Sequence, residues 1–348
     1  MGSPEVPSNT DVALDRPRRG VVSMLEGMAF YVVMIRTIRD LMGLKRTLVL
    51  VLGGQVLVTF LAQVSWSGSF QAGTMSLEMQ TSFLVGYFII VSFFWMTGFF
   101  LAYLVVGTSG LDLIDQERRK GTLLLIVSKP ISRLHFLLGK LLALVLTSMM
   151  LEAVILSVSA LVLWALLGLD PDTMSALLGV LPWVFLFSLL VIYMFAALSM
   201  TLSTLVRSAL VRNAVFTIIV VIVFVAGPVM RMGWSSIYED YRLYYVDGSY
   251  NLGNAYVLML DRAETGRLAP QSQAWLGITT GAYKAGTEVL LTTLVGATGA
   301  FDPDIGAMPP SMERTTYVAP AVSLVFILAI GTIALGVAGW VIRREEVK

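Results

Sequence analysis

Few side chains in this sequence could carry out covalent chemistry. The chain has no Cys and a single His, His135. The missing Cys excludes disulfides, thiolate metal sites and Cys nucleophiles. One imidazole without partners at ligand spacing makes neither a metal site nor a proton relay, so we interpret His135 as a bystander. The carboxylate pairs Asp170 with Asp172 and Asp302 with Asp304 flank prolines and are typical of solvated turns.

The sequence also lacks the loop that would hold a nucleotide. No Gly-x-x-x-x-Gly-Lys-Ser/Thr occurs, so the backbone cradle and the lysine that grip phosphates in that motif are missing. The formal net charge of +1 gives no reason to expect a nucleic-acid partner. We therefore predict that the chain is not itself an enzyme and holds no cofactor or metal.

Glu152 is the acidic residue that lies deepest within an apolar run. It follows Lys140 by 12 residues, about 18 Å along a helix. A carboxylate at that depth in a membrane is costly, so it should face the helix bundle, a cavity or a polar partner. Two interpretations stay open: an intramembrane polar site in a transport route, or a structural hydrogen bond to another helix.

The composition indicates that lipid rather than water surrounds most of the chain. Hydrophobic residues make up 57% and charged residues 14%, and the mean hydropathy is +0.80. The sequence also contains several apolar runs of 17 residues or more, a length typical of membrane-spanning helices. The predicted spans are residues 47–65, 82–106, 141–167, 176–206, 214–230 and 318–342.

Lys and Arg counts orient these spans. Connections 66–81 and 168–175 hold no Lys or Arg, whereas 107–140 holds six. Because cytoplasmic loops are enriched in these residues, the first two connections should lie outside and the third inside. The basic residues before the first span and after the last place both termini in the cytoplasm. We therefore expect a multi-pass protein of the plasma membrane.

The remaining segments complete the organisation. Residues 1–46 form a cytoplasmic tail with an amphipathic stretch near its end, which should lie flat on the membrane or, alternatively, pack as a cytosolic helix. Residues 47–230 hold spans one to five, 231–317 form an extracytoplasmic segment, and 318–348 hold the last span and tail. The predicted fold class is an all-α polytopic membrane protein with six transmembrane helices, an N-terminal amphipathic interfacial helix and a large external segment between helices five and six.

The charged connection from Asp112 to Lys140 is the most informative segment. Its middle, Gly121 to Val127, is apolar between charged flanks. Such a pattern indicates a short helix laid against another surface, which Lys129-Pro130 then ends. A plain positive-inside loop is the alternative that the residues alone leave open.

This connection resembles the pattern of permease subunits in the type-2 ABC exporter family. The resemblance is carried by Glu117 with Gly121-Thr122-Leu123, by Pro130-Ile131-Ser132-Arg133, and by Gly139-Lys140. It implies that the loop docks on a separate ATP-binding cassette subunit. The residues implied in coupling to that subunit are Glu117, Arg118, Gly121, Thr122, Leu123, Leu124, Ile126, Pro130 and Arg133.

The resemblance further implies a second permease subunit, identical or paralogous, with ATP and Mg²⁺ bound by the ATP-binding partner. The function it predicts is the transmembrane permease subunit of an ATP-driven exporter. Two alternatives stay open: a module that transmits ATP-driven motion to an extracytoplasmic partner through residues 231–317, and a proton-coupled secondary transporter that uses Glu152.

Introduced cysteines test the topology, since the sequence contains none. A membrane-impermeant maleimide added outside should label single cysteines at the outer positions and leave the inner ones unlabelled. The outer variants are Met75→Cys, Asp172→Cys and Tyr250→Cys, and the inner variants are Lys120→Cys, Ala209→Cys and Glu346→Cys. Labelling of position 120 from outside would overturn the orientation.

Overall fold

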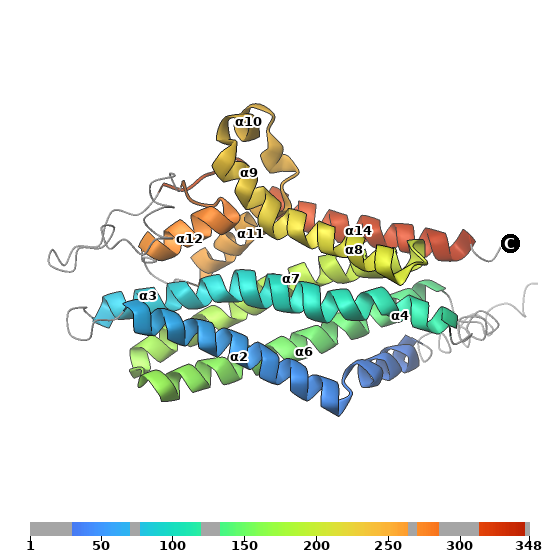
Figure 1. The fold of residues 1–348 in the computed structure, drawn as a ribbon, viewed down its shortest axis with the longest axis horizontal. Helices are drawn as coiled ribbons and strands as arrows, with labels where there is room; N and C mark the ends of the chain where they lie inside the picture. Colours follow the sequence, from blue (N-terminus) through green and yellow to red (C-terminus); the bar gives the residue numbers. More distant parts are fainter. Residues whose placement is uncertain (1–29, 70–76, 120–132, 264–269, 285–312, 345–348) are drawn as a thin grey trace, which may run out of the picture.

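The structure is a computed structural model that describes residues 30–69, 77–119, 133–263, 270–284 and 313–344. Long helices run side by side along one axis and form a bundle (Figure 1). Residues 30–41 are helical and lead into α2 (Leu44–Ser69). Within the described ranges the chain is helical apart from short turns and one isolated bridge between Tyr283 and Arg314. The predicted all-α class is therefore confirmed.

Five described helices are long and apolar enough to cross a membrane. They are Leu84–Arg119, α6 (Arg133–Leu167), α7 (Pro171–Leu205), Ala209–Arg231 and α14 (Pro320–Arg344). Each coincides with a predicted span. The first predicted span, 47–65, lies inside the 26-residue helix α2, which is not among the five, so the count of six stays a prediction.

The second span is longer than the predicted 82–106 because the helix continues past its apolar run. It comprises α3 (Leu77–Ile90), the π-helix η1 (Val91–Gly107) and α4 (Thr108–Arg119). Hydrogen bonds in a π-helix reach one residue further than in an α-helix. The three parts follow one another as a single rod along the bundle (Figure 1).

Helix α7 lies at the centre of the bundle and packs against α14, α6, η1 and α4. Its start is well specified, since Asp170 accepts hydrogen bonds from the backbone N–H groups of Asp172 at 2.8 Å and Thr173 at 3.3 Å. These bonds, and first the one from the Thr173 hydroxyl, lower the pKa of Asp170. The helix passes through Pro182 without ending.

Small residues allow the helices to approach closely. A Cβ on Gly331 of α14 would lie 2.5 Å from the ring of Tyr193 on α7, and a Cβ on Gly98 of η1 would lie 2.7 Å from the ring of Phe224. Larger residues at either site would push the helices apart. Close approach through small residues is how helices associate in a membrane, where lipid is as apolar as the helix surface.

The segment 231–317, which we call the connecting segment, carries short helices in its described part. The chain passes from α8 (Ala209–Val221) through η2 (Ile222–Ala226) to α9 (Gly227–Gly233), α10 (Ser235–Asp240) and η3 (Leu243–Tyr245), and then to α11 (Gly248–Arg262) and α12 (Pro270–Thr280). Helix α10 projects from the bundle, whereas α11 packs against α7 and α14 (Figure 1).

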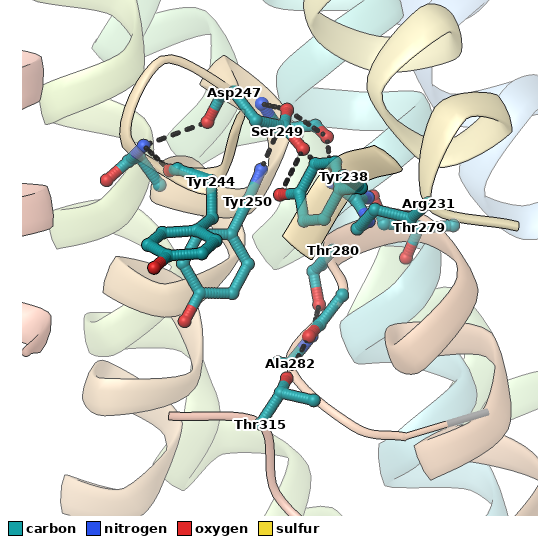
Figure 2. A network of polar contacts seen from close by, with 12 residues as sticks. Arg231, Tyr238, Tyr244, Asp247, Ser249, Tyr250, Thr279, Thr280, Ala282 and Thr315 are labelled. Atoms are coloured by element: carbon teal, nitrogen blue, oxygen red, sulfur yellow. Dashed lines mark hydrogen bonds and ion pairs between the residues drawn. The ribbon is translucent and has the colours of Figure 1, made fainter. Parts of the chain in front are cut away.

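A buried ion pair organises this segment (Figure 2). Arg231 donates to Asp247, and also to the Ser249 hydroxyl at 2.7 Å and the Thr279 carbonyl at 3.1 Å. Asp247 in addition caps α11 and accepts from the Tyr238 hydroxyl at 2.9 Å. Burial, and next the Asp247 charge, raise the pKa of Tyr238. Asp247 thus joins α9, α10 and α11, and Arg231 adds α12 through the Thr279 carbonyl.

Tyr250 then links this network to the last span. Its hydroxyl accepts from the backbone N–H groups of Tyr317 at 3.0 Å and Val318 at 3.3 Å, just before α14. The ring of Tyr317 stacks on Tyr244 with centroids 4.9 Å apart.

Tyr250 is 0% exposed, so position 250 is unsuitable for the cysteine-labelling experiment on topology. Tyr241, 75% exposed, is the position to label in its place.

Neutralising Asp247 should destabilise the connecting segment much more than neutralising Asp261. Asp247→Asn leaves the buried Arg231 without its counter-charge, which costs on the order of 3–5 kcal/mol. Asp261→Asn breaks a pair with Arg314 whose side chains are 46% and 42% exposed, and such pairs contribute about 1 kcal/mol or less. Asp247→Asn should therefore lower the unfolding temperature in detergent and speed tryptic cleavage of the connecting segment, with Asp261→Asn as control. Equal effects would contradict the organising role of the buried pair.

Candidate functional site

The residues predicted to couple to an ATP-binding partner divide into two groups. Glu117 and Arg118 lie in the last turn of α4, and Arg133 begins α6, which starts before the predicted span 141–167. The remaining six, Gly121, Thr122, Leu123, Leu124, Ile126 and Pro130, lie outside the described residues. The geometry of the site is thus that of the helix ends on either side of the loop.

Helix α4 is amphipathic and buries both apolar and charged side chains. Leu111, Leu113 and Ile114 face the bundle, and Asp115 beside them is 7% exposed. The start of α2, the start of α6, the end of α7 and the start of α8 gather around α4; we call this the basic end of the bundle (Figure 1). A carboxylate buried among helices needs a cationic or hydrogen-bonding partner.

Arg212 supplies that partner from the first turns of α8. Its side chain is 0% exposed and donates to Asp112 and to Asp115, each at 3.2 Å, and to the Val206 carbonyl at 3.2 Å. Asp115 also pairs with Arg119 at 2.7 Å. Removing one partner from a buried group of this kind typically costs several kcal/mol. The Arg212 side chain therefore fixes α8 against α4.

A second ion pair fixes α4 against α6. Lys140, with its side chain 5% exposed, donates to Glu117 at 3.0 Å and to the Leu113 carbonyl at 3.2 Å. Next to it, a Cβ on Gly139 would lie 3.3 Å from the Phe30 carbonyl, so the glycine lets the N-terminal helix approach. The Gly139-Lys140 pair of the resemblance thus lies at a junction of three helices.

Two further arginines complete the contacts of α4. Arg118 donates to the carbonyls of Ser203 at 3.3 Å and Thr204 at 3.1 Å, at the end of α7, where the last carbonyls of a helix lack intrahelical donors. Arg46 of α2 donates to the Ser109 hydroxyl at 2.5 Å. The charged groups that join α4 to α6, α7 and α8 form what we call the α4 ion-pair cluster: Asp112, Asp115, Glu117, Arg118, Lys140 and Arg212.

The single histidine lies at the same end. The ring of His135 meets the ring of Phe30 edge-on with centroids 6.4 Å apart. This contact packs the N-terminal helix against the first turn of α6.

Glu152 is fully buried in the middle of α6, as its depth in the sequence predicts. Its Oε1 accepts a hydrogen bond from the Ser188 hydroxyl of α7, which lies 2.9 Å from the Thr97 hydroxyl of η1. Among the described residues its Oε2 has no hydrogen-bond partner. Glu152 therefore takes part in a polar contact between three helices, and its second oxygen could accept a further donor.

Tyr256 of the connecting segment reaches the same region from α11. Its ring centroid lies 4.6 Å from that of Phe187 and 5.0 Å from that of Phe93, and its hydroxyl donates to the Ile89 carbonyl at 2.9 Å. Burial is the main cause that raises the pKa of Tyr256 well above its usual value. Sequence reasoning missed this residue, because an aromatic in a polar connection carries no signal of depth.

Comparison with known proteins assigns the chain to a family. Residues 63–279, more than half of the sequence, match the sequence model of a family described as ABC-2 family transporter protein. The chain belongs to this family. Among curated proteins, no match reaches significance.

The matched range of this ABC-2 transporter chain covers the candidate site. It includes all of α4, the loop to α6, Glu152 and Arg212, and it ends before α14. The ABC-2 chain is a multi-pass membrane component of an ABC transporter, and membership implies an ATP-binding partner that carries the ATPase. The resemblance to permease subunits of type-2 ABC transporters is therefore confirmed at the level of the family.

A charge swap across α4 and α6 tests the cluster in the ABC-2 chain. Glu117→Lys places two cations together at a buried site and should lower the unfolding temperature clearly. Adding Lys140→Glu restores an ion pair with the two charges exchanged. The double variant should recover most of the lost unfolding temperature, measured by thermal unfolding in detergent. The exposed pair of Lys284 with Glu313, 56% and 73% exposed, is the matched control, and its swap should change little. An unchanged unfolding temperature in Glu117→Lys alone would show that the buried pair does not form.

Proposed function

We propose that this chain is the transmembrane permease subunit of an ATP-driven exporter. It couples ATP hydrolysis by a separate ATP-binding cassette subunit to movement of substrate across the plasma membrane. The loop between α4 and α6 docks on that subunit, and the chain itself hydrolyses nothing. ATP and Mg²⁺ bind the partner, and a second permease subunit, identical or paralogous, completes the transport unit.

The observation that supports this function best is the set of contacts made by α4. Ion pairs and charged hydrogen bonds join α4 to α6, α7 and α8, and Arg46 joins it to α2. A helix held in this way moves together with its neighbours. A push on the loop that follows Arg119 is therefore passed to the whole basic end, which is what coupling to an ATPase requires.

The proposed cycle follows from that rigidity. ATP-driven closure of two cytosolic subunits moves the docking loops, and each loop carries its α4 and the helices paired with it. The bundles then alternate between inward and outward openings, a rigid-body change of the kind that allosteric proteins use. ATP drives the change because its binding favours the closed arrangement of the partners.

The proposed orientation places the basic end in the cytoplasm, with both termini inside. Arg46, Arg133 and Arg207 lie at this end together with the end of α14, which carries Arg343 and Arg344. Such enrichment at one end is the positive-inside pattern. The connecting segment then lies outside, and the docking loop faces the compartment that contains ATP.

A second candidate function is transmission of ATP-driven motion to an extracytoplasmic partner. The seating of Tyr256 between Phe93 and Phe187 favours it, because this contact couples the connecting segment to η1 and α7. A purified complex with bound ATPase that moves substrate in vesicles would support export and exclude a pure motion-transmitter. The absence of any ATPase partner, together with proton-driven flux lost in Glu152→Gln, would support a secondary transporter.

The docking assignment predicts the effect of a charge in the loop. Leu124→Asp or Ile126→Asp forces a carboxylate into an apolar contact, where it is desolvated or the contact is lost, at a cost on the order of several kcal/mol. The variant should reach the membrane at near-normal levels but lose its ATP-binding subunit on purification, together with transport-linked ATPase activity.

The control for this experiment is Tyr241→Asp, which puts the same charge on a residue that is 75% exposed in the connecting segment. It should keep the partner in stoichiometric amount. If Leu124→Asp also retains the partner and transports normally, the loop is only a connector, and the proposed coupling fails.

A further inference from the structure

The basic end contains a cavity that the α4 ion-pair cluster does not use. Its volume is about 300 Å³, and it lies between the N-terminal helix, the start of α2, the junction of η1 with α4, and the first half of α6. Apolar side chains form most of its wall, chiefly Leu50, Val51, Val105, Leu144 and Leu151. The cavity is open on one side, where Met150 and Val154 are exposed.

Two buried hydroxyls in the wall lack partners. Ser148 is 0% exposed and Thr147 is 9% exposed, and neither hydroxyl has a hydrogen-bond partner among the described residues. Both residues line the cavity. A buried hydroxyl without a partner costs free energy. These two groups therefore indicate an occupant that brings hydrogen-bond acceptors into an otherwise apolar space.

The size and lining of the cavity exclude water as a sufficient occupant. At about 30 Å³ per molecule it would take about ten waters, and each needs two to four polar partners to be held. The polar side chains of the lining are Arg46, Thr47, Ser109, Thr147 and Ser148, which are too few to hold that many. Hydrocarbon fits the apolar wall, and ester carbonyls at its polar end would accept from Ser148 and Thr147.

Charge at the mouth selects the head group. Arg46 lines the cavity and is exposed. Arg36 and Arg39 of the N-terminal helix and Lys45 at the start of α2 are also exposed, with Asp40 as the acidic residue among them. A basic cluster beside a membrane surface attracts anionic lipid by about 1 kcal/mol per Lys or Arg. The exposed apolar residues Leu48 and Val49 of α2 continue the lipid-facing surface beyond the mouth.

We propose that this cavity binds one acyl chain of an anionic phospholipid from the leaflet at the basic end, with the phosphate on Arg46 and an ester carbonyl on Ser148 or Thr147. The site is separate from docking of an ATPase and holds whether or not the chain is an exporter. A lipid seated there fills the space between α2 and α6 and stabilises their packing next to α4.

The test uses the full-length chain in nanodiscs that contain a trace of phosphatidylglycerol with a photoreactive diazirine on its acyl chain. Mass spectrometry should map crosslinks to residues 141–154. Unlabelled phosphatidylglycerol should compete about fivefold better than phosphatidylcholine, the ratio to which about 1 kcal/mol corresponds. Arg46→Gln should remove that preference, whereas Arg343→Gln, a cation at the end of another helix, should keep it.

Filling the cavity provides the second arm. Ser148→Phe occupies the space without removing a hydrogen bond and should abolish crosslinks at residues 141–154. Val158→Phe, ten residues or almost three turns further along α6 at an exposed position, should leave them intact. If Ser148→Phe does not fold, the loss of lipid preference in Arg46→Gln decides alone.

Three results would overturn the proposal. One is equal competition by phosphatidylglycerol and phosphatidylcholine in the unmodified protein, and another is unchanged crosslinking in Ser148→Phe. The third is efficient bismaleimide crosslinking of Ser148→Cys between two copies of the chain, which would mean that a second copy occupies the cavity.

Discussion

A charge inside an apolar bundle is tolerated only when an opposite charge or several hydrogen bonds accompany it, and this constraint governs the structure at both ends. At the basic end, Arg212 and Lys140 are buried and each meets a carboxylate of α4. In the connecting segment, Arg231 and Asp247 do the same. The apolar faces alone would let helices slide past one another, whereas each buried pair specifies one relative position.

The middle of the bundle is held by weaker and shorter contacts. There the helices meet through hydroxyls such as Ser188 and Thr97 and through glycines such as Gly98. Glu152 has one oxygen bonded and one without a partner among the described residues. Contacts between hydroxyls and small residues are easier to rearrange than buried ion pairs. The arrangement thus combines two fixed ends with a centre that can change its packing.

The sequence predicted the parts of this architecture that depend on local pattern. Apolar length located the long helices, and the depth of Glu152 predicted its burial. The sequence did not predict which residues the buried charges pair with. Arg212 and Asp115, for example, are 97 residues apart, and only the fold brings them together. The family resemblance implied a docking role for Glu117 and Arg118, and their contacts within this chain join α4 to α6 and α7. The docking role itself stays a prediction.

The continuity of one helix gives these separate contacts a common consequence. From Leu77 to Arg119, α3, η1 and α4 form a single rod. Near one end of the rod, Asp115 and Glu117 pair with Arg212 and Lys140, and towards the other the Ile89 carbonyl accepts from Tyr256 of α11. A displacement of α4 along its axis cannot be absorbed by a break in this helix. It must therefore either shift Tyr256 relative to Phe93 and Phe187 or move the connecting segment with the rod, so that the two ends of the bundle respond together.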